Sequence, residues 1–190
     1  MTQFQLSNNS SANTPPVTSL WETLPTTSFQ TIELTSGSIL LEDQATLPTG
    51  LPKNHYYLSK VFSFVSPGAT TIVGKFSGIF RGKATSTGVY PYVVFKVLNA
   101  NNSLAGVGWS GACAPLHNTY ETRTIVGTIP SINVQNNGTY VIEIGYRLDR
   151  SNVTGVQTGY FQYGTKADWF EQSLIEGNIA EGNAWFRMPV

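Results

Sequence analysis

The residues best suited to chemistry lie in one glycine-rich stretch in the middle of the chain. Gly106, Gly108 and Gly111 match the G-x-G-x-x-G spacing of a dinucleotide-binding turn. That turn binds pyrophosphate only where a strand leads directly into the N-terminus of a helix. Here Pro115 follows, and the sequence after it has no helical period. We therefore interpret these glycines as a strand end and a wide turn around Trp109.

The same stretch contains a serine and a cysteine that could act as nucleophiles. Ser110 stands in a G-x-S-x-A string, in which Ala112 replaces the last glycine of a hydrolase nucleophile elbow. The only cysteine, Cys113, is followed by His117 and Asn118. A short loop cannot by itself hold a thiol and an imidazole about 3 Å apart while a third group orients the imidazole. We predict that Cys113 is a buried or half-buried free thiol, and we predict no catalytic residues.

Candidate metal ligands and paired carboxylates are few. The two histidines, His55 and His117, are far apart in sequence and with a single cysteine do not give zinc spacing. Residues 149–152 could offer oxygens to calcium, but too few carboxylates converge there. Glu42 and Asp43 are adjacent, so on a strand they would point to opposite faces. We predict no metal and no cofactor, while an enzyme with carboxylates drawn from distant segments stays an open alternative.

The elements that would position such residues are β-strands. The clearest is residues 139–148, whose even-numbered positions are apolar or aromatic and whose odd-numbered positions, from Val141 to Arg147, are mixed. This alternation predicts one buried face and one largely solvated face. An Asn-Asn-Gly sequence directly before it favours a tight turn into an antiparallel strand. A second strand, residues 89–98, is apolar on both faces, which predicts a central strand covered on two sides.

The fold class follows from how often such strands recur. About nine or ten strands, spaced roughly ten residues apart, indicate an all-β, antiparallel β-sandwich of jelly-roll type. One short helix is expected at residues 166–176, where Trp169, Phe170 and Leu174 cluster on one side. The sandwich domain is predicted to span residues 28–190.

Residues 1–27 have a different composition and are predicted to form an extended N-terminal arm. They are rich in Ser, Asn, Thr and Pro, so they bury too little apolar area to offset the loss of backbone entropy on ordering. Isolated large apolar residues would dock the arm on a partner subunit, and these are Phe4, Leu6, Leu20, Trp21 and Leu24. The alternative is that the arm folds back on its own domain.

Composition restricts the class of protein. Charged residues make up 12% of the chain, against about 25% in an average protein, and the net charge is zero. A nucleic-acid-binding surface is therefore not expected. No segment approaches the ~20 apolar residues of a membrane span, and the first residues lack the basic and apolar regions of a secretory signal. A surface of hydroxyls and amides is typical of extracellular β-sandwiches and of virion proteins.

Aromatic residues are more numerous than one core needs. Exposed aromatic rings beside amides and hydroxyls can stack on sugars or be buried against another subunit. The possible ligand or interface aromatics are Tyr90, Tyr92, Trp109, Tyr120, Tyr160 and Tyr163.

In this layout of a polar arm followed by a charge-poor sandwich, the chain resembles tailed-phage virion proteins of the head-decoration or tail-fibre type. The resemblance implies a homo-oligomer, with a trimer favoured, that is attached through its arm to other virion proteins such as the major capsid protein. It also implies a location in the virion and no chemistry of the protein's own. The alternative function is a carbohydrate- or receptor-binding module that recognises a host surface glycan.

Overall fold

The computed structural model describes residues 2–11, 14–22, 30–33, 41–47, 53–149, 155–163 and 185–189. These residues form eleven β-strands and contain no helix. The helix predicted at residues 166–176 lies outside the described residues.

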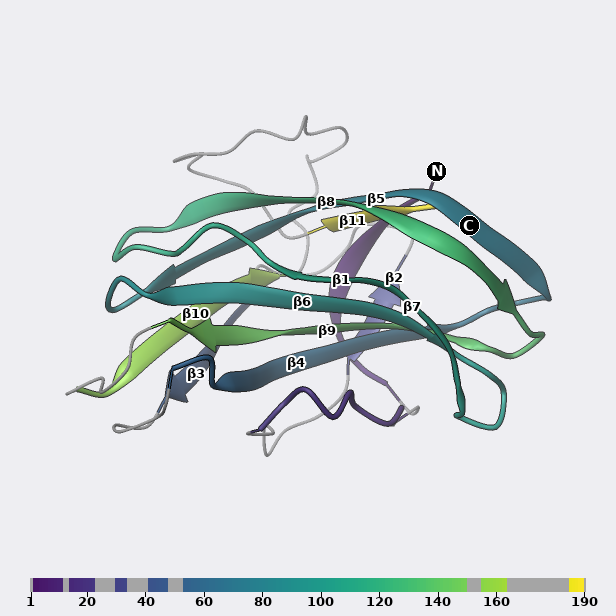
Figure 1. The fold of residues 1–190 in the computed structure, drawn as a ribbon, viewed down its shortest axis with the longest axis horizontal. Helices are drawn as coiled ribbons and strands as arrows, with labels where there is room; N and C mark the ends of the chain where they lie inside the picture. The colour runs from purple at the N-terminus through teal and green to yellow at the C-terminus, as the bar shows by residue number, and fades with distance from the viewer. Residues whose placement is uncertain are drawn as a thin grey trace.

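Eight strands form two antiparallel layers, with β5 and β8 above β6, β9 and β4 in Figure 1. The bounds of these strands are β3 (Leu41–Leu47), β4 (Tyr56–Val65), β5 (Thr70–Ala84), β6 (Val89–Leu98), β7 (Leu104–Ala112), β8 (Glu121–Val134), β9 (Thr139–Leu148) and β10 (Gln157–Tyr163). One layer has the order β3-β10-β5-β8 and the other has the order β4-β9-β6-β7. The chain changes layer at most connections, which is jelly-roll connectivity. The predicted fold class is confirmed.

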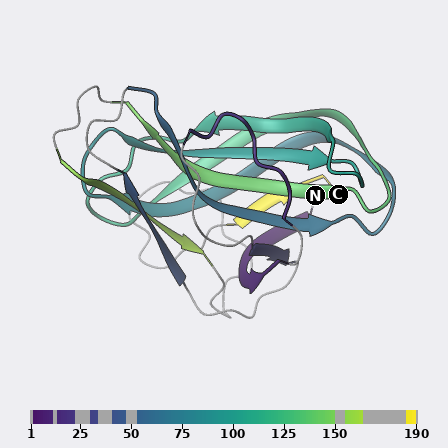
Figure 2. The same cartoon turned by 90° about the horizontal axis from the view of Figure 1, so that it is seen from below.

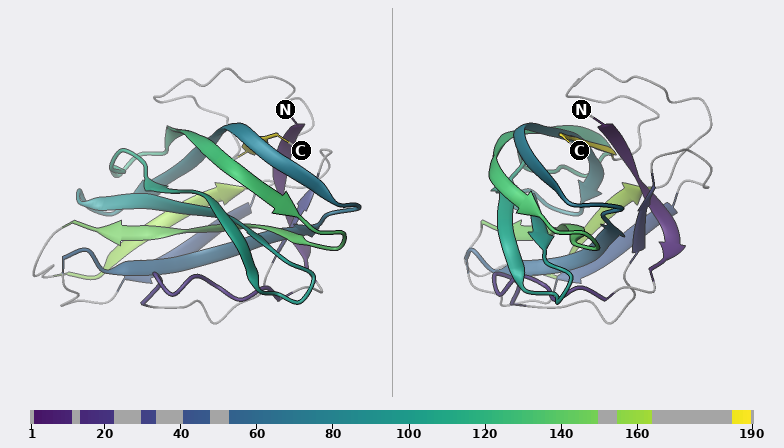
Figure 3. Two further views of the ribbon diagram at one scale, coloured as in Figure 1. Left: turned by 45° about the vertical axis from the view of Figure 1, so that its right-hand side comes forward. Right: turned by 90° about the vertical axis from the view of Figure 1, so that its right-hand side faces the viewer.

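Three further strands join the two layers along one side: β1 (Thr2–Ser10), β2 (Gln30–Glu33) and β11 (Trp185–Met188). β11 pairs with β5, β1 lies between β11 and β2, and β2 runs parallel to β4 over two residue pairs. The right-hand view of Figure 3 shows β1, in dark purple, along this side. The first strand of the predicted arm therefore belongs to the sheet of its own domain. The composition argument missed this because it counts apolar side chains and neglects backbone hydrogen bonds, which β1 makes on both edges.

The main core lies between the two layers and is rich in aromatic rings. Phe76 and Phe95 stack with ring centroids 5.2 Å apart, and Phe80 stacks on Phe161 at 4.8 Å. The even-numbered side chains of β9 also point into this core, as their alternation predicts, and they are all buried.

The opposite face of β9 is buried as well, which corrects the expectation of a largely solvated face. Val141 and Glu143 are both 0% exposed. Residues 14–22 cross this face, and Figure 2 shows them as a dark purple segment running over the strands. Their apolar side chains join a second cluster with the outward residues Leu58, Val61, Val94, Leu98 and Val141. β6 is thereby covered on two sides, as predicted from its sequence.

Candidate functional site

The second cluster contains a buried ion pair between Lys96 on β6 and Glu143 on β9. Lys96 Nζ lies 2.5 Å from Glu143 Oε1, and the two side chains are 4% and 0% exposed. Lys96 Nζ also donates to the carbonyl oxygen of Pro16 at 2.6 Å and to Thr18 Oγ1 at 3.2 Å. An ammonium group has three N–H donors, so each donor of Lys96 has an acceptor.

Both carboxylate oxygens of Glu143 accept hydrogen bonds from residues 14–22. Its Oε2 accepts a hydrogen bond from Trp21 Nε1 at 2.6 Å, and its Oε1 accepts one from the backbone N–H of Thr18 at 2.8 Å. The Trp21 indole lies directly over Gly145, where an added Cβ would be 2.5 Å from the ring. We call the group of Lys96, Glu143, Thr18 and Trp21 the latch, because it fixes residues 14–22 on the sheet.

The latch also shows where the predicted docking residues of the arm lie. Leu6 is 0% exposed in the main core, Trp21 is 6% exposed, and Leu20 packs half-buried against the second cluster. Phe4 lies in β1, where its backbone pairs with Phe186, and Leu24 lies outside the described residues. Within this chain the described arm residues therefore contact their own domain. Docking of this segment on another subunit stays a prediction.

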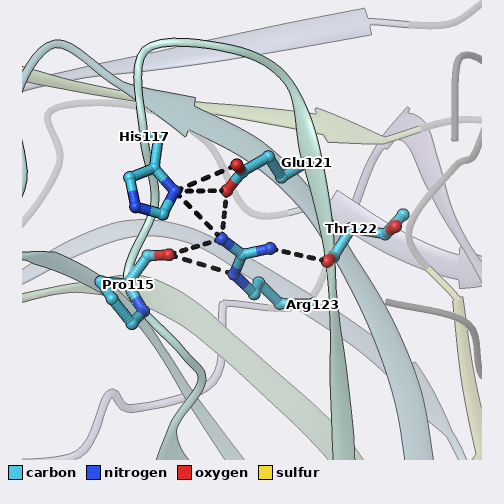
Figure 4. Close-up of polar contacts among 5 residues, drawn as sticks. All are labelled: Pro115, His117, Glu121, Thr122 and Arg123. Carbon is cyan, nitrogen blue, oxygen red and sulfur yellow. Dashed lines mark hydrogen bonds and ion pairs between the residues drawn. The ribbon is translucent and has the colours of Figure 1, made fainter. Parts of the chain in front are cut away.

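A second polar cluster lies at the connection from β7 to β8 (Figure 4). His117 Nδ1 is 2.9 and 3.0 Å from the two carboxylate oxygens of Glu121, and Arg123 forms an ion pair with the same carboxylate. The Arg123 guanidinium also donates to the carbonyl oxygen of Pro115 at 2.7 and 3.0 Å and to that of Thr122 at 3.1 Å.

The geometry of this cluster is suited to holding a loop. A carboxylate that orients an imidazole is one part of a catalytic triad, but a triad also needs a nucleophile within hydrogen-bond reach of the ring. In the described structure the polar contacts of the His117 ring are with the Glu121 carboxylate and with Arg123 Nη2. Cys113 is buried and forms no disulfide bond, as predicted. The sequence reading missed Glu121 and Arg123, although their i, i+2 spacing on a strand places both on one face.

The predicted ligand aromatics lie in separate places rather than in one site. Tyr92 makes edge contacts with Trp21 and Tyr56 and hydrogen-bonds to Ser110 Oγ at 2.9 Å, so it belongs to the face that carries the latch. Tyr90 lies on the same strand, with the Arg147 guanidinium 4.9 Å from its ring.

Trp109 occupies the seam between β7 and β8. Its ring is half-buried, 5.8 Å from that of Phe76, and it lies against Gly127, where an added Cβ would be 2.0 Å from the indole. Trp109 therefore packs into the core more than it faces a ligand. Tyr163 ends β10, and its side chain is outside the described part of the structure.

Tyr120 and Tyr160 come together around Lys83 on β5. Lys83 Nζ is 4.4 Å from the centroid of the Tyr120 ring and 4.5 Å from that of the Tyr160 ring. Arg81 lies beside them, 5.5 Å from the Tyr120 ring, and donates from Nε to Gln162 Oε1 at 2.9 Å. Burial lowers the pKa of Arg81 because desolvation disfavours its charged form. We call Lys83, Tyr120 and Tyr160 the lysine bracket.

Metal-ligand and membrane-spanning features were sought in the described part of the chain. It contains no group of three or more His, Cys, Asp or Glu side chains that could hold a metal ion. Among the same residues, no helix is long and apolar enough to cross a membrane.

Comparisons with known proteins do not assign this chain to a family. No family model matches the chain, and no curated protein matches it. Two crystal structures of a CocE/NonD family hydrolase from Staphylococcus aureus align with it at 9% and 10% identity and TM-scores of 0.49 and 0.46. Each alignment covers 84% of this chain and 34% of the hydrolase chain, so this chain spans about a third of that protein's length.

Proposed function

We propose that this chain is a non-enzymatic structural component of a virus particle, a capsid decoration protein that docks on neighbouring virion subunits through its N-terminal segment. The observation that carries the proposal is the latch. It binds residues 14–22 through fully buried charges, and those contacts use the atoms of a peptide segment and not of a small molecule.

The contacts of the latch are well suited to subunit exchange. The Pro16 carbonyl, the Thr18 N–H and the Trp21 indole are present in every copy, so a neighbour's segment offers the face of β6 and β9 the same partners. Exchange of an identical element between protomers is a common route to homo-oligomers. Low charge and a surface of hydroxyls and amides also suit a protein built into a shell.

Light scattering on the purified full chain tests this proposal. We expect a homo-oligomer, with a trimer favoured, and a shift toward monomer in Trp21→Ala, since that change removes the segment's main anchor. The control is Val126→Ala, at a side chain that is 63% exposed on β8. A wild-type monomer, or a folded Trp21→Ala variant with unchanged mass, would overturn exchange of the segment.

Immunogold electron microscopy tests the location. An antibody to the chain should label the shell of particles purified from cells that encode it. Particles that carry no label would contradict a structural role in the virion.

The second candidate is a carbohydrate- or receptor-binding module. The observation that favours it is the lysine bracket, in which two of the predicted aromatics flank a cation. Binding to a glycan array that is lost on substitution of these residues, without any association with particles, would favour this function.

A further inference from the structure

Among the residues that the structure describes, Lys83 has no carboxylate partner, unlike Lys53, Lys96 and Arg123. Lys96 pairs with Glu143, Arg123 pairs with Glu121, and Lys53 pairs with Asp149. The contacts of Lys83 are with the faces of two phenol rings. Lys83 is half-buried, so its ammonium group is partly shielded from water. No described anion offsets the free-energy cost of this desolvation.

Tyr120 adds an unsatisfied polar atom to the bracket. Its hydroxyl oxygen is buried and has no hydrogen-bond partner among the described residues. A buried hydroxyl without a partner costs free energy, and such groups commonly mark the place of a bound water, ion or ligand. A phenol O–H donates most strongly to an anionic acceptor.

A second described cation lies beside the bracket. Arg81 lies on the same strand, two residues from Lys83, and its guanidinium carbon is 5.5 Å from the centroid of the Tyr120 ring. The nearest carboxylate in sequence to Tyr120 is that of Glu121, and it already binds Arg123 and His117. An oxyanion bound at the bracket would therefore pair with an ammonium group that has no described carboxylate partner, and it could accept a hydrogen bond from the buried Tyr120 hydroxyl.

We propose that the lysine bracket binds the oxyanion of an acidic saccharide, that is, a sugar bearing a carboxylate or a sulfate group. Lys83 binds the oxyanion, the Tyr120 hydroxyl donates to it, and the half-buried Tyr160 and Tyr120 rings contact the sugar. A nucleic-acid phosphate is the less suitable oxyanion, because the chain has zero net charge. The site does not depend on the chain's being a virion protein, and it can be present whether or not that proposal holds.

Titration calorimetry on the full chain tests the site with three probes: an oligogalacturonate, a heparin-derived sulfated oligosaccharide and a neutral dextran of similar length. We expect one or both acidic probes to bind and the neutral probe not to bind. A site that accepts both kinds of oxyanion would bind both acidic probes. A site that accepts only a carboxylate, or only a sulfate, would bind only the probe that carries that group. Binding should weaken as the salt concentration rises, because salt screens partly exposed charges.

Two lysine variants provide the matched comparison. Lys83→Met should weaken binding about tenfold or more, a factor that corresponds to ~1.4 kcal/mol. Lys75→Met is the control, since Lys75 is an exposed lysine on the same strand and the change in net charge is the same. Tyr120→Phe keeps the ring and removes the hydroxyl, and it should weaken binding by a smaller factor.

Three results would overturn the proposal. They are binding of none of the probes, equal binding of neutral and acidic probes, and equal loss of binding in Lys83→Met and Lys75→Met. The last result would mean that the acidic probes respond to overall charge and not to the bracket. Thermal unfolding of each variant shows whether it is folded before binding is compared.

Discussion

Lys96 and Lys83 occupy the outward faces of the two layers, and they differ in what surrounds the ammonium group. Lys96 is covered by residues 14–22 and has a carboxylate, a carbonyl and a hydroxyl as acceptors. Within the described part of the chain, Lys83 lies between two aromatic rings without an acid partner, beside a hydroxyl that has no hydrogen-bond partner.

This difference indicates that Lys96 stabilises the fold, whereas Lys83 is available to bind a ligand. A buried charge with all of its hydrogen bonds satisfied has no capacity left for a ligand, and removing its partner exposes the full cost of desolvation. A half-buried charge without an anion contributes little to stability. Stability measurements should therefore separate the two lysines sharply.

The largest effect is expected at the latch. Lys96→Met leaves Glu143 buried without its cation and should lower the free energy of unfolding by about 3–5 kcal/mol, measured by urea denaturation. The double variant Lys96→Met/Glu143→Leu removes both charges and should lose less than the sum of the two single losses. A loss below ~1 kcal/mol in Lys96→Met would mean that the pair is not enclosed.

The next largest loss of stability is expected from a substitution at Gly145, over which the Trp21 indole lies. Gly145→Ala places a Cβ 2.1 Å from the Tyr57 carbonyl oxygen and 2.5 Å from the Trp21 ring, so both the Tyr57 backbone and the indole have to move. Overpacking of this kind costs about 1–3 kcal/mol. Gly68→Ala is the control, since nothing lies within 4 Å of its added Cβ. Equal stability of the two variants would show that Trp21 does not rest on Gly145.

Tyr140 extends the comparison to hydroxyl groups, because it is enclosed in the core whereas the Tyr120 hydroxyl lies in the bracket. Burial raises the pKa of Tyr140, and a hydrogen bond with Ser66 partly opposes that rise. The folded state thus holds the Tyr140 proton more tightly than the unfolded state does. Stability should fall as pH rises above ~10, by at most ~1.4 kcal/mol per pH unit. Tyr140→Phe should flatten this decline in denaturation midpoints measured from pH 8 to pH 11, and an unchanged decline would contradict the assignment.

The smallest effect on stability is expected at the bracket. Lys83→Met removes two partly exposed cation–π contacts, which are worth about 0.5–1 kcal/mol each at exposed sites, and replaces them with apolar contact. We expect the free energy of unfolding to change by less than ~1 kcal/mol. A loss as large as that of Lys96→Met would mean that Lys83 is a structural residue.

The sequence predicts the sandwich well because alternation reports directly which side chains face a core. The two-sided burial of β6 was predicted from its own residues, but the identity of its cover was not. Residues 14–22 cover it with apolar side chains and are fixed there in part through backbone atoms of Pro16 and Thr18, and backbone groups leave no trace in composition. The odd-numbered face of β9 was predicted to be largely solvated because Glu143 is charged, and its partner Lys96 lies 47 residues away.

The lysine bracket was predictable only in part. Tyr120 and Tyr160 were identified as surplus aromatics, but they flank Lys83 because β10 pairs with β5 and the start of β8 lies on the other side of that strand. That arrangement depends on the strand order of the folded sheet. It cannot be predicted from the spacing of these residues along the sequence.

Hydrogen exchange of the Trp21 indole proton, followed by NMR in the full chain, tests most directly whether residues 14–22 are fixed by the latch. The proton donates to the buried carboxylate of Glu143 at 2.6 Å. We predict that it exchanges as slowly as the backbone amides of β9, and much faster in Lys96→Met. Exchange in the wild-type chain at the rate of an exposed indole would contradict the latch, and with it the proposed docking of the N-terminal segment.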